Sequence, residues 1–247
     1  MAGARDKVAI VTGASHGIGR EIAMVLAERG HRVRSISMGK EDIATTHREA
    51  KEKGFDIEVY EGDVSSSRDI EAFRKQVGDL GPVRAIVNNA AIRPIGTVLT
   101  TTEETWDQVF DVNVKGSFLA TRAFLPAMIA AGGGSVVFIS SCSSQASTNL
   151  IAYSSTKMAM LAMSRCMAED HKKDRVRVNA ILPGPIDSGM MRGIPEEIIE
   201  FCRQQGVQGR LGLPRDVANA VGFLVSDEAE TISGTELRVN FWPGLFA

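Results

Sequence analysis

Tyr153 and Lys157 are the residues of this chain best suited by type and spacing to acid–base chemistry. They lie four positions apart, so in a helix they share one face and are separated by about 6 Å along the axis. An ammonium group beside a phenol favours the phenolate and lowers the pKa of the tyrosine from its ordinary value of about 10. Such a tyrosine can donate and accept a proton near neutral pH. The spacing alone is a weak indication, so the elements that position the pair matter.

Strand-like and helix-like segments alternate along the whole chain. Short apolar runs predict strands at residues 7–12, 33–37, 57–60, 83–88, 135–140, 176–181 and 236–240. Amphipathic periodicity predicts helices at 18–29, 41–53, 68–77, 103–130, 153–171, 195–205 and 214–226. Pro126 is expected to kink the helix at 103–130 or to lie near its end. This alternation predicts an α/β fold with a parallel sheet of about seven strands, covered by helices on both faces.

No linker, repeat or change of composition divides residues 1–247, so a single domain is expected. In sheets of this kind, ligands bind at the carboxyl ends of the strands, near the point where the strand order reverses. The candidate chemistry is therefore expected at those strand ends.

A glycine-rich turn joins the first predicted strand to the first predicted helix. Its sequence is Thr12-Gly13-Ala14-Ser15-His16-Gly17-Ile18-Gly19. Glycines allow a tight turn and a close approach to a pyrophosphate, and the helix N-terminus favours negative charge. The spacing G-x-x-x-G-x-G differs from the more familiar G-x-G-x-x-G pattern. A turn without a ligand could have the same composition, but the strand-turn-helix position favours a nucleotide site.

With this turn and the Tyr-Lys pair, the chain resembles the short-chain dehydrogenase/reductase family over nearly its full length. Asn88-Asn89-Ala90 matches the family's N-N-A-G, although Ala91 replaces the glycine. Further matches are Asp63-Val64, Asp111-Val112-Asn113-Val114, Ile139-Ser140-Ser141, Pro183-Gly184-Pro185-Ile186 and residues 210–218. The resemblance implies a Rossmann-type doubly wound parallel sheet. It also implies an NAD(P)-dependent oxidoreductase that interconverts a ketone and a secondary alcohol by hydride transfer.

The resemblance implies a catalytic set of Asn113, Ser141, Tyr153 and Lys157. Tyr153 would exchange a proton with the substrate oxygen, and Ser141 would hydrogen-bond the same atom. Lys157 would lower the proton affinity of Tyr153 and hold the nicotinamide ribose, and Asn113 would position a water between Lys157 and solvent. The usual family spacing points to Ser140, whereas counting along the preceding strand points to Ser141. Only one of them can face the substrate, because strand faces alternate; we prefer Ser141 and keep Ser140 as the alternative.

The nucleotide site implied by the resemblance draws on the glycine-rich turn, the ends of the second to fourth strands, the Tyr-Lys pair and the loop after the sixth strand. Its predicted members are Gly13, Ser15, His16, Gly17, Ile18, Gly19, Ser37, Met38, Asp63, Val64, Asn89, Ala90, Ala91, Tyr153, Lys157, Pro183, Gly184, Ile186 and Ser188.

The end of the second strand bears on the choice between NADP and NAD. NAD-specific members of the family usually carry an Asp there, which binds the ribose hydroxyls and repels a 2′-phosphate. Here Ser37-Met38-Gly39 is followed by Lys40, and His16 stands where many NADP-dependent members have Arg. We therefore predict NADP, with NAD as the alternative.

The substrate pocket is less specified by the sequence. The resemblance places residues 91–94, 142–146 and 188–193 around it, with Arg93 either attracting a carboxylate or phosphate or pairing with an acid at the surface. A 3-oxoacyl thioester and a sugar or polyol are both candidate substrates. A reductase that acts on an acidic acyl carrier would be expected to have a basic patch, for which Arg93, Arg192 and Arg210 are candidates. The apolar C-terminal residues 241–247 are expected to pack on a neighbour or over a pocket.

Partners and location follow from composition and from the family. The net charge of −2 includes no basic block, so nucleic-acid binding is not expected. No apolar run approaches the ~20 residues that span a bilayer, and no signal-peptide core is present, so no membrane association is expected. Three scattered cysteines and four dispersed histidines predict neither disulfides nor a metal site, which favours the cytoplasm. Family members are commonly tetramers that pair the helices at 103–130 and 153–171, so a homotetramer is expected.

A second hypothesis is a nucleotide-sensing or scaffold protein that kept the fold but lost the chemistry. Loss of Tyr153, Lys157 or the serine pair would have favoured it, and all of these are present. The sequence therefore favours the enzyme.

Overall fold

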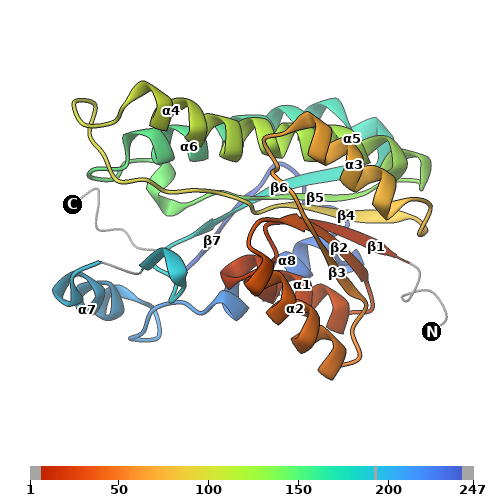
Figure 1. Cartoon of the computed structure of the whole chain (residues 1–247), viewed down its shortest axis with the longest axis horizontal. Helices are drawn as coiled ribbons and strands as arrows, with labels where there is room; N and C mark the ends of the chain where they lie inside the picture. Colours follow the sequence, from red (N-terminus) through yellow and green to blue (C-terminus); the bar gives the residue numbers. More distant parts are fainter. Residues whose placement is uncertain (1–6, 192–193, 241–247) are drawn as a thin grey trace.

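The computed structural model describes residues 7–191 and 194–240 and contains one seven-stranded parallel sheet (Figure 1). Its strands are β1 (Val8–Thr12), β2 (Arg32–Ser37), β3 (Ile57–Glu61), β4 (Val83–Asn88), β5 (Gly134–Ile139), β6 (Val176–Pro183) and β7 (Glu236–Val239). They lie in the order β3-β2-β1-β4-β5-β6-β7, and each neighbouring pair is parallel. The strand order reverses between β1 and β4, so the predicted doubly wound α/β fold is confirmed.

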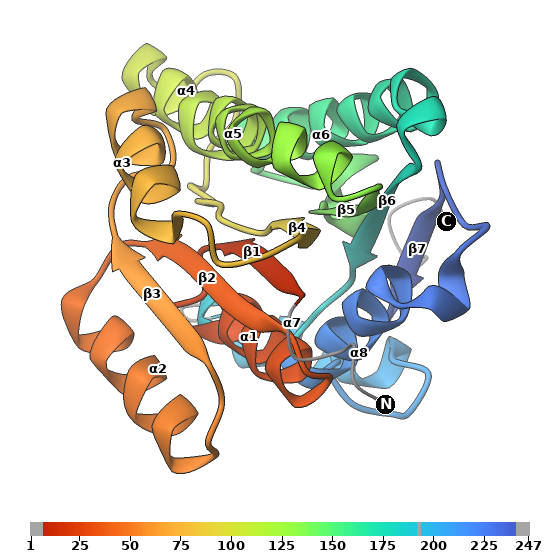
Figure 2. The same cartoon turned by 90° about the vertical axis from the view of Figure 1, so that its right-hand side faces the viewer.

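Helices cover both faces of the sheet, as the alternation of segments predicts. Helices α1 (Gly17–Glu28), α2 (Lys40–Glu52) and α8 (Pro214–Val225) lie on one face. Helices α3 (Ser67–Val77), α4 (Glu103–Phe110), α5 (Gly116–Ala130) and α6 (Ile151–Asp170) lie on the other (Figures 1 and 2). Helix α7 (Glu196–Gln205) lies apart from both layers, beyond the carboxyl ends of the strands.

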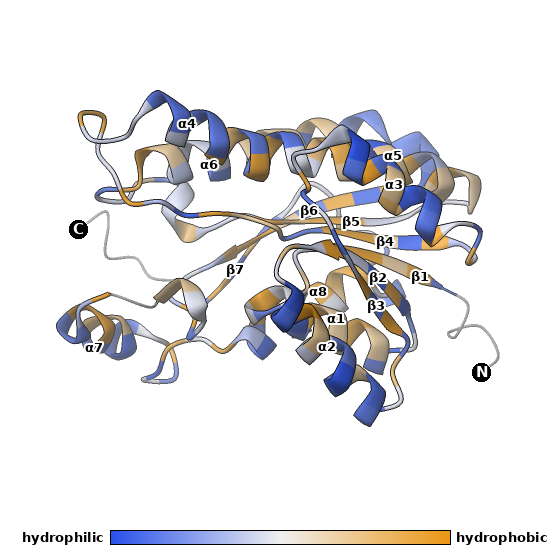
Figure 3. Ribbon diagram, in the orientation of Figure 1, coloured by the Kyte–Doolittle hydropathy of each residue, from blue (hydrophilic) through white to orange (hydrophobic). Residues whose placement is uncertain are grey.

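The strands are hydrophobic on both sides because both sides are covered. Along β1, Ala9 and Val11 pack into the core shared with α1 and α8, whereas Val8 and Ile10 pack into the core under α3, α5 and α6. Figure 3 shows this pattern as largely hydrophobic strands beneath helices whose outer surfaces are hydrophilic. The rigid sheet therefore fixes the positions of the loops at its carboxyl edge.

The structure corrects three predicted boundaries. The expected helix at 103–130 is broken by a π-helical turn, Asp111–Lys115, and Pro126 lies inside α5. Helix α6 begins at Ile151, two residues before the predicted start, so Tyr153 belongs to its first turn. Strand β6 continues through Pro183, which the sequence assigned to a loop, because β7 pairs with it there. Pairing with the distant strand β7 sets the end of β6, and the apolar pattern of the sequence does not reveal that pairing.

Within the part of the chain that is described, no helix has the length and hydropathy needed to cross a membrane. The same residues contain no group of three or more His, Cys, Asp or Glu side chains arranged to hold a metal ion.

Candidate active site

A cleft of about 1150 Å³ opens at the carboxyl ends of the strands. Its walls come from the turn after β1, the ends of β2 to β6, one face of α6, the loop after β6 and helix α7. The cleft crosses the point between β1 and β4 where the strand order reverses, which is where ligands bind in sheets of this type.

The glycine-rich turn forms the floor at one end of the cleft, and three of its cleft-lining residues are glycines. Gly13 and Gly17 adopt φ values of 74° and 57°, which favour glycine. A Cβ atom on Gly13 would lie 2.9 Å from the Cα of Ala90, and one on Gly19 would lie 2.0 Å from the carbonyl oxygen of Gly13. His16 caps α1 without a side-chain hydrogen bond, which leaves the first N–H groups of that helix available to an anion. The turn therefore fits the pyrophosphate of a dinucleotide.

Hydrogen bonds of Asn89 hold this turn against the end of β4. Its Nδ2 donates to the carbonyl oxygens of Thr12 and Gly13 at 3.0 and 3.1 Å. The hydroxyl of Thr12 accepts from the backbone N–H groups of Asn89 and Ala90, both at 3.0 Å. These bonds hold the two strand ends at the reversal point in a fixed relation.

Ser15 differs in its surroundings from the other residues predicted to bind the nucleotide. It is fully buried and does not line the cleft. Its Oγ accepts a hydrogen bond from the Ser37 hydroxyl at 2.8 Å, and its carbonyl oxygen accepts from Arg20 and Thr46. Ser15 therefore stabilises the turn through contacts on the side that faces away from the cleft. The sequence motif does not distinguish the two faces of the turn.

The end of β2 supplies Ser37 and Met38 to the cleft, and no acidic residue of that segment reaches it. Lys40 and His16, two side chains on which the NADP prediction depends, each lie near a carboxylate. Lys40 lies 3.9 Å from Glu61, and the imidazole of His16 lies 3.6 Å from Asp42. His16 lines the cleft, whereas Lys40 does not.

Tyr153 and Lys157 lie together on the cleft-facing side of α6 and are almost completely buried. The Nζ of Lys157 donates to the carbonyl oxygen of Ile139 at 2.7 Å and lies 5.5 Å from the centre of the Tyr153 ring. Burial lowers the pKa of Lys157 from 10.5 to about 7. Burial also raises the pKa of Tyr153, against the opposing effects of a hydrogen bond with Ser141 and the charge of Arg93.

This result differs from the expectation that Lys157 would hold the pKa of Tyr153 below 10. The Lys157 amine donates a hydrogen bond to Ile139 at the end of β5 and lies near the ring of Tyr153. Burial disfavours the charged form of this amine as well. Desolvation therefore outweighs the expected attraction, and both groups favour their neutral forms.

Ser140 and Ser141 have separate partners. The hydroxyl of Ser140 donates to the carbonyl oxygen of Lys157 at 2.9 Å and joins β5 to α6. The hydroxyl of Ser141 accepts from the N–H of Ser143 at 3.1 Å, and it favours the ionised form of Tyr153, which lowers the pKa of the tyrosine. Of the two serines, Ser141 is therefore the one whose side chain affects the pKa of Tyr153.

The comparisons with known proteins agree with this geometry. The family model described as enoyl-(acyl carrier protein) reductase matches residues 13–241. The protein belongs to the short-chain dehydrogenase/reductase family. The predicted family and the class of oxidoreductase acting on CH–OH or C=O groups are thereby confirmed.

The similar members of the short-chain dehydrogenase/reductase family carry different enzyme names. The chain is 34% identical over 237 residues to 3-oxoacyl-(acyl-carrier-protein) reductase FabG of Staphylococcus aureus, covering 95% of this chain and 96% of the relative. It is 35% identical over 238 residues to acetoacetyl-CoA reductase of Rhizobium meliloti, covering 95% and 97%. A solved structure, provisionally named a gluconate dehydrogenase of Agrobacterium tumefaciens, superposes with a TM-score of 0.91 at 26% identity and covers 96% of this chain and 95% of its own.

Membership of the short-chain dehydrogenase/reductase family makes the protein an NAD(P)-dependent reductase. Apart from Ser15 and Asn113, the residues predicted for catalysis and nucleotide binding all line the one cleft.

Asn113 lies in the π-helical turn of this short-chain dehydrogenase/reductase and is fully buried. Its Nδ2 donates to the carbonyl oxygen of Ile92 at 3.1 Å and to the hydroxyl of Thr156 at 3.0 Å. Its Oδ1 accepts from the N–H of Ile92 at 2.9 Å. Asn113 therefore ties the loop after β4 to α6, a role that its sequence neighbours do not reveal.

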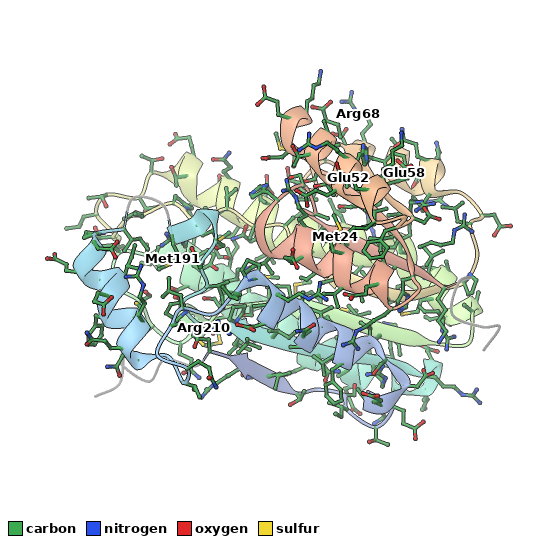
Figure 4. All side chains as sticks on the ribbon, turned by 90° about the horizontal axis from the view of Figure 1, so that it is seen from below. Met24, Glu52, Glu58, Arg68, Met191 and Arg210 are labelled. Carbon is green, nitrogen blue, oxygen red and sulfur yellow. The ribbon has the colours of Figure 1, made fainter. Side chains whose placement is uncertain are left out.

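Sequence reasoning missed two contributions to the cleft. The carbonyl oxygen of Ile139 holds the Lys157 amine, and Ile198 and Cys202 of α7 close the far side. A backbone acceptor has no sequence signal. Helix α7 follows a loop whose path cannot be read from composition. Met191, labelled beside α7 in Figure 4, belongs to that loop.

Proposed function

We propose that this protein is an NADP-preferring reductase that interconverts a ketone and a secondary alcohol. The observation that carries the proposal is that Tyr153, Ser141 and Lys157 line one cleft whose other end is the glycine-rich turn, with the Lys157 amine 5.5 Å from the centre of the Tyr153 ring. When bound, the nicotinamide supplies or accepts the hydride. Tyr153 transfers the proton to or from the substrate oxygen, and Ser141 orients that oxygen by a hydrogen bond.

Lys157 contributes charge and position. Its amine donates to the Ile139 carbonyl, so the side chain is held before any ligand arrives. An anionic or hydroxyl-bearing neighbour in the cleft raises the proton affinity of a buried amine, and a charged Lys157 then favours the phenolate of Tyr153. Gly13, Gly17 and the N-terminus of α1 bind the pyrophosphate in this proposal, and Pro183, Gly184, Ile186 and Ser188 line the nicotinamide end.

Two substrate classes have support. The names of the Staphylococcus and Rhizobium relatives favour a 3-oxoacyl thioester. The name of the Agrobacterium structure favours an oxidised sugar or sugar acid. A basic patch for an acyl carrier has little support, because Arg210 is paired with Asp216 at 2.9 Å and does not line the cleft. Arg192, like the C-terminal residues 241–247, lies outside the described residues.

The serine assignment predicts different effects for the two alanine variants. Ser141→Ala is expected to lower kcat by about 100-fold with little change in melting temperature, because its hydroxyl acts on the reacting oxygen. Ser140→Ala is expected to keep kcat within about threefold but to destabilise the fold by about 1–3 kcal/mol, because the carbonyl of Lys157 loses a buried donor. Steady-state kinetics and thermal unfolding measure both. The reverse pattern would assign catalysis to Ser140.

The cofactor preference is tested at Ser37. Ser37→Asp is expected to lower the ratio of kcat/KM for NADPH to that for NADH at least about tenfold, because a carboxylate at the end of β2 repels a 2′-phosphate. Ser37→Asn is the matched neutral control, since it also replaces the hydroxyl that donates to Ser15. An equal ratio in the two variants, or wild-type preference for NADH, would refute the proposed NADP site.

We also propose that the protein is a homotetramer, as is common in this family. Trp106 on α4, Phe118 on α5 and Met158 on α6 are exposed by 36%, 47% and 41%. Exposed large apolar groups on one helical layer are typical of a surface that self-associates. Light scattering coupled to gel filtration would distinguish a tetramer from a monomer.

A further inference from the structure

The substrate half of the cleft is mostly apolar but contains one cation besides Lys157. Ile92, Ile95, Leu150, Met190 and Ile194 line this region. Among the described cleft residues, Arg93 and Lys157 are the only arginine or lysine. The charge of Lys157 is disfavoured by burial, so Arg93 is the permanent positive charge of the substrate half.

No carboxylate in the described part of the chain neutralises Arg93. Its Nη2 donates to the carbonyl oxygen of Met190 at 2.5 Å, across the cleft from its own loop. The acids on the cleft wall have other partners: Asp111 is paired with Lys115 at 3.1 Å, and Asp63 accepts from the N–H and hydroxyl of Ser65. A guanidinium has five N–H donors, so most of those on Arg93 remain for a ligand. The sequence-based alternative, an Arg93 paired with a surface acid, has no support in these contacts.

Hydrogen bonds tie the backbone beside Arg93 to α6, the helix that carries Tyr153 and Lys157. Ile92, the preceding residue, is held at both its N–H and its carbonyl by the Asn113 amide. That amide is bonded to Thr156, which lies between Tyr153 and Lys157 on α6. Pro94 follows and restricts the backbone of Arg93 to extended conformations. Arg93 and Tyr153 line the same cleft, and the positive charge of Arg93 opposes the rise in the pKa of Tyr153.

We propose that Arg93 is a specificity-determining residue that binds a carboxylate carried by the same small molecule whose carbonyl meets Tyr153. The substrate class is therefore an oxo acid and its hydroxy-acid product. This inference rests on the proposed function and narrows it. An arginine fork binds a carboxylate through two parallel hydrogen bonds, which orients the molecule as well as holding it. The alternative source of an anion is the distal phosphate of a coenzyme thioester. A long arm separates that phosphate from the reacting carbonyl, so a cation in the same cleft as Tyr153 matches it poorly.

The test compares matched substrates in matched variants. A series of oxo acids of increasing chain length is assayed against the methyl ester of each, with wild type, Arg93→Gln and Arg93→Lys. We expect wild type to prefer the acids. Arg93→Gln is expected to lower the acid-to-ester ratio of kcat/KM by about 10- to 100-fold, mainly through KM, as for loss of one charge-assisted pair. Arg93→Lys should recover part of the ratio.

The control variant is Arg210→Gln. Arg210 lies on the segment between α7 and α8 and is labelled in Figure 4, and it does not line the cleft. Its loss should leave the acid-to-ester ratio unchanged. The esters also report whether Arg93→Gln damages the fold, because the hydrogen bond to Met190 is lost for every substrate alike.

The other possible results of these assays overturn either the role of Arg93 or the proposed function. An acid-to-ester ratio that is equal in wild type and Arg93→Gln overturns the inference while leaving ketone reduction intact. A dependence on Arg93 that appears only between 3-oxobutanoyl-CoA and its N-acetylcysteamine thioester assigns Arg93 to a phosphate and also overturns it. If no ketone is reduced, the proposed function fails. Calorimetric binding of the oxo acids in the presence of NADP⁺, to wild type and Arg93→Gln, then decides the inference separately.

Discussion

Replacing Tyr153 with Phe is expected to lower kcat by about a thousandfold, within the range for removal of a positioned general acid. The change deletes one oxygen from a side chain that is 6% exposed, so the packing of α6 is retained. Nucleotide affinity should change by less than about threefold, because the pyrophosphate cradle belongs to the turn after β1. Single-turnover kinetics and fluorescence titration with NADPH measure the two effects.

Tyr60 provides the matched control, since the chain has two tyrosines. Its ring packs against Phe73, with ring centroids 5.5 Å apart, and it does not line the cleft. Tyr60→Phe should therefore leave turnover unchanged. Wild-type turnover in Tyr153→Phe would exclude Tyr153 as the proton donor.

Replacing Lys157 with Met is expected to abolish measurable turnover and at the same time to stabilise the fold. The lost ammonium lowers activity by more than about 100-fold, since the phenolate of Tyr153 loses its electrostatic support. The stability gain arises because a buried lysine is costly. Its pKa in the folded protein is about 7, below the ordinary 10.5 that applies to the unfolded chain.

The pH dependence of this gain has a definite sign. Protonation of Lys157 favours the unfolded chain, so its cost is full below about pH 7 and disappears as the pH rises through 10.5. The shift corresponds to on the order of 5 kcal/mol at low pH, against about 1 kcal/mol for the lost hydrogen bond to Ile139. Denaturant unfolding of the protein without added nucleotide should therefore show Lys157→Met to be more stable at pH 6, with the difference shrinking toward pH 10.

Lys115→Met is the control for this comparison. Lys115 is half-exposed and pairs with Asp111 at the surface, so its removal should change the free energy of unfolding by less than about 0.5 kcal/mol at either pH. A Lys157→Met protein that is less stable than wild type at pH 6 would show that the buried amine stabilises the fold.

The sequence predicts the fold and the residues of the cleft because each depends on a local pattern. Alternating apolar runs and amphipathic segments identify the strands and helices, and their order requires a parallel sheet. Gly13 and Gly19 are signalled by the strand-turn-helix position, and the structure shows why side chains are excluded there. The four-residue spacing places Tyr153 and Lys157 on one face of a helix, as observed.

What the sequence does not predict depends on packing between distant segments. The π-helical turn that positions Asn113 is fixed by bonds to Ile92 and Thr156, and neither bond is visible in the local pattern. Burial sets the pKa directions of Tyr153 and Lys157, and burial is a property of the assembled cleft. The partners of Ser15 and Arg93 likewise come from other elements, so their roles emerge only in three dimensions.

Transfer of deuterium tests the central claim most directly. Wild-type protein would be incubated with NADPH deuterated at the nicotinamide C4 and with a panel of ketones, keto-sugars, oxo acids and 3-oxoacyl thioesters, with Tyr153→Phe as the blank. Mass spectrometry should find deuterium on the carbinol carbon of an alcohol product formed only by wild type, and the best substrate would identify the class. No labelled alcohol from any substrate, with tight NADPH binding retained, would contradict the proposed reduction and favour a nucleotide-sensing role.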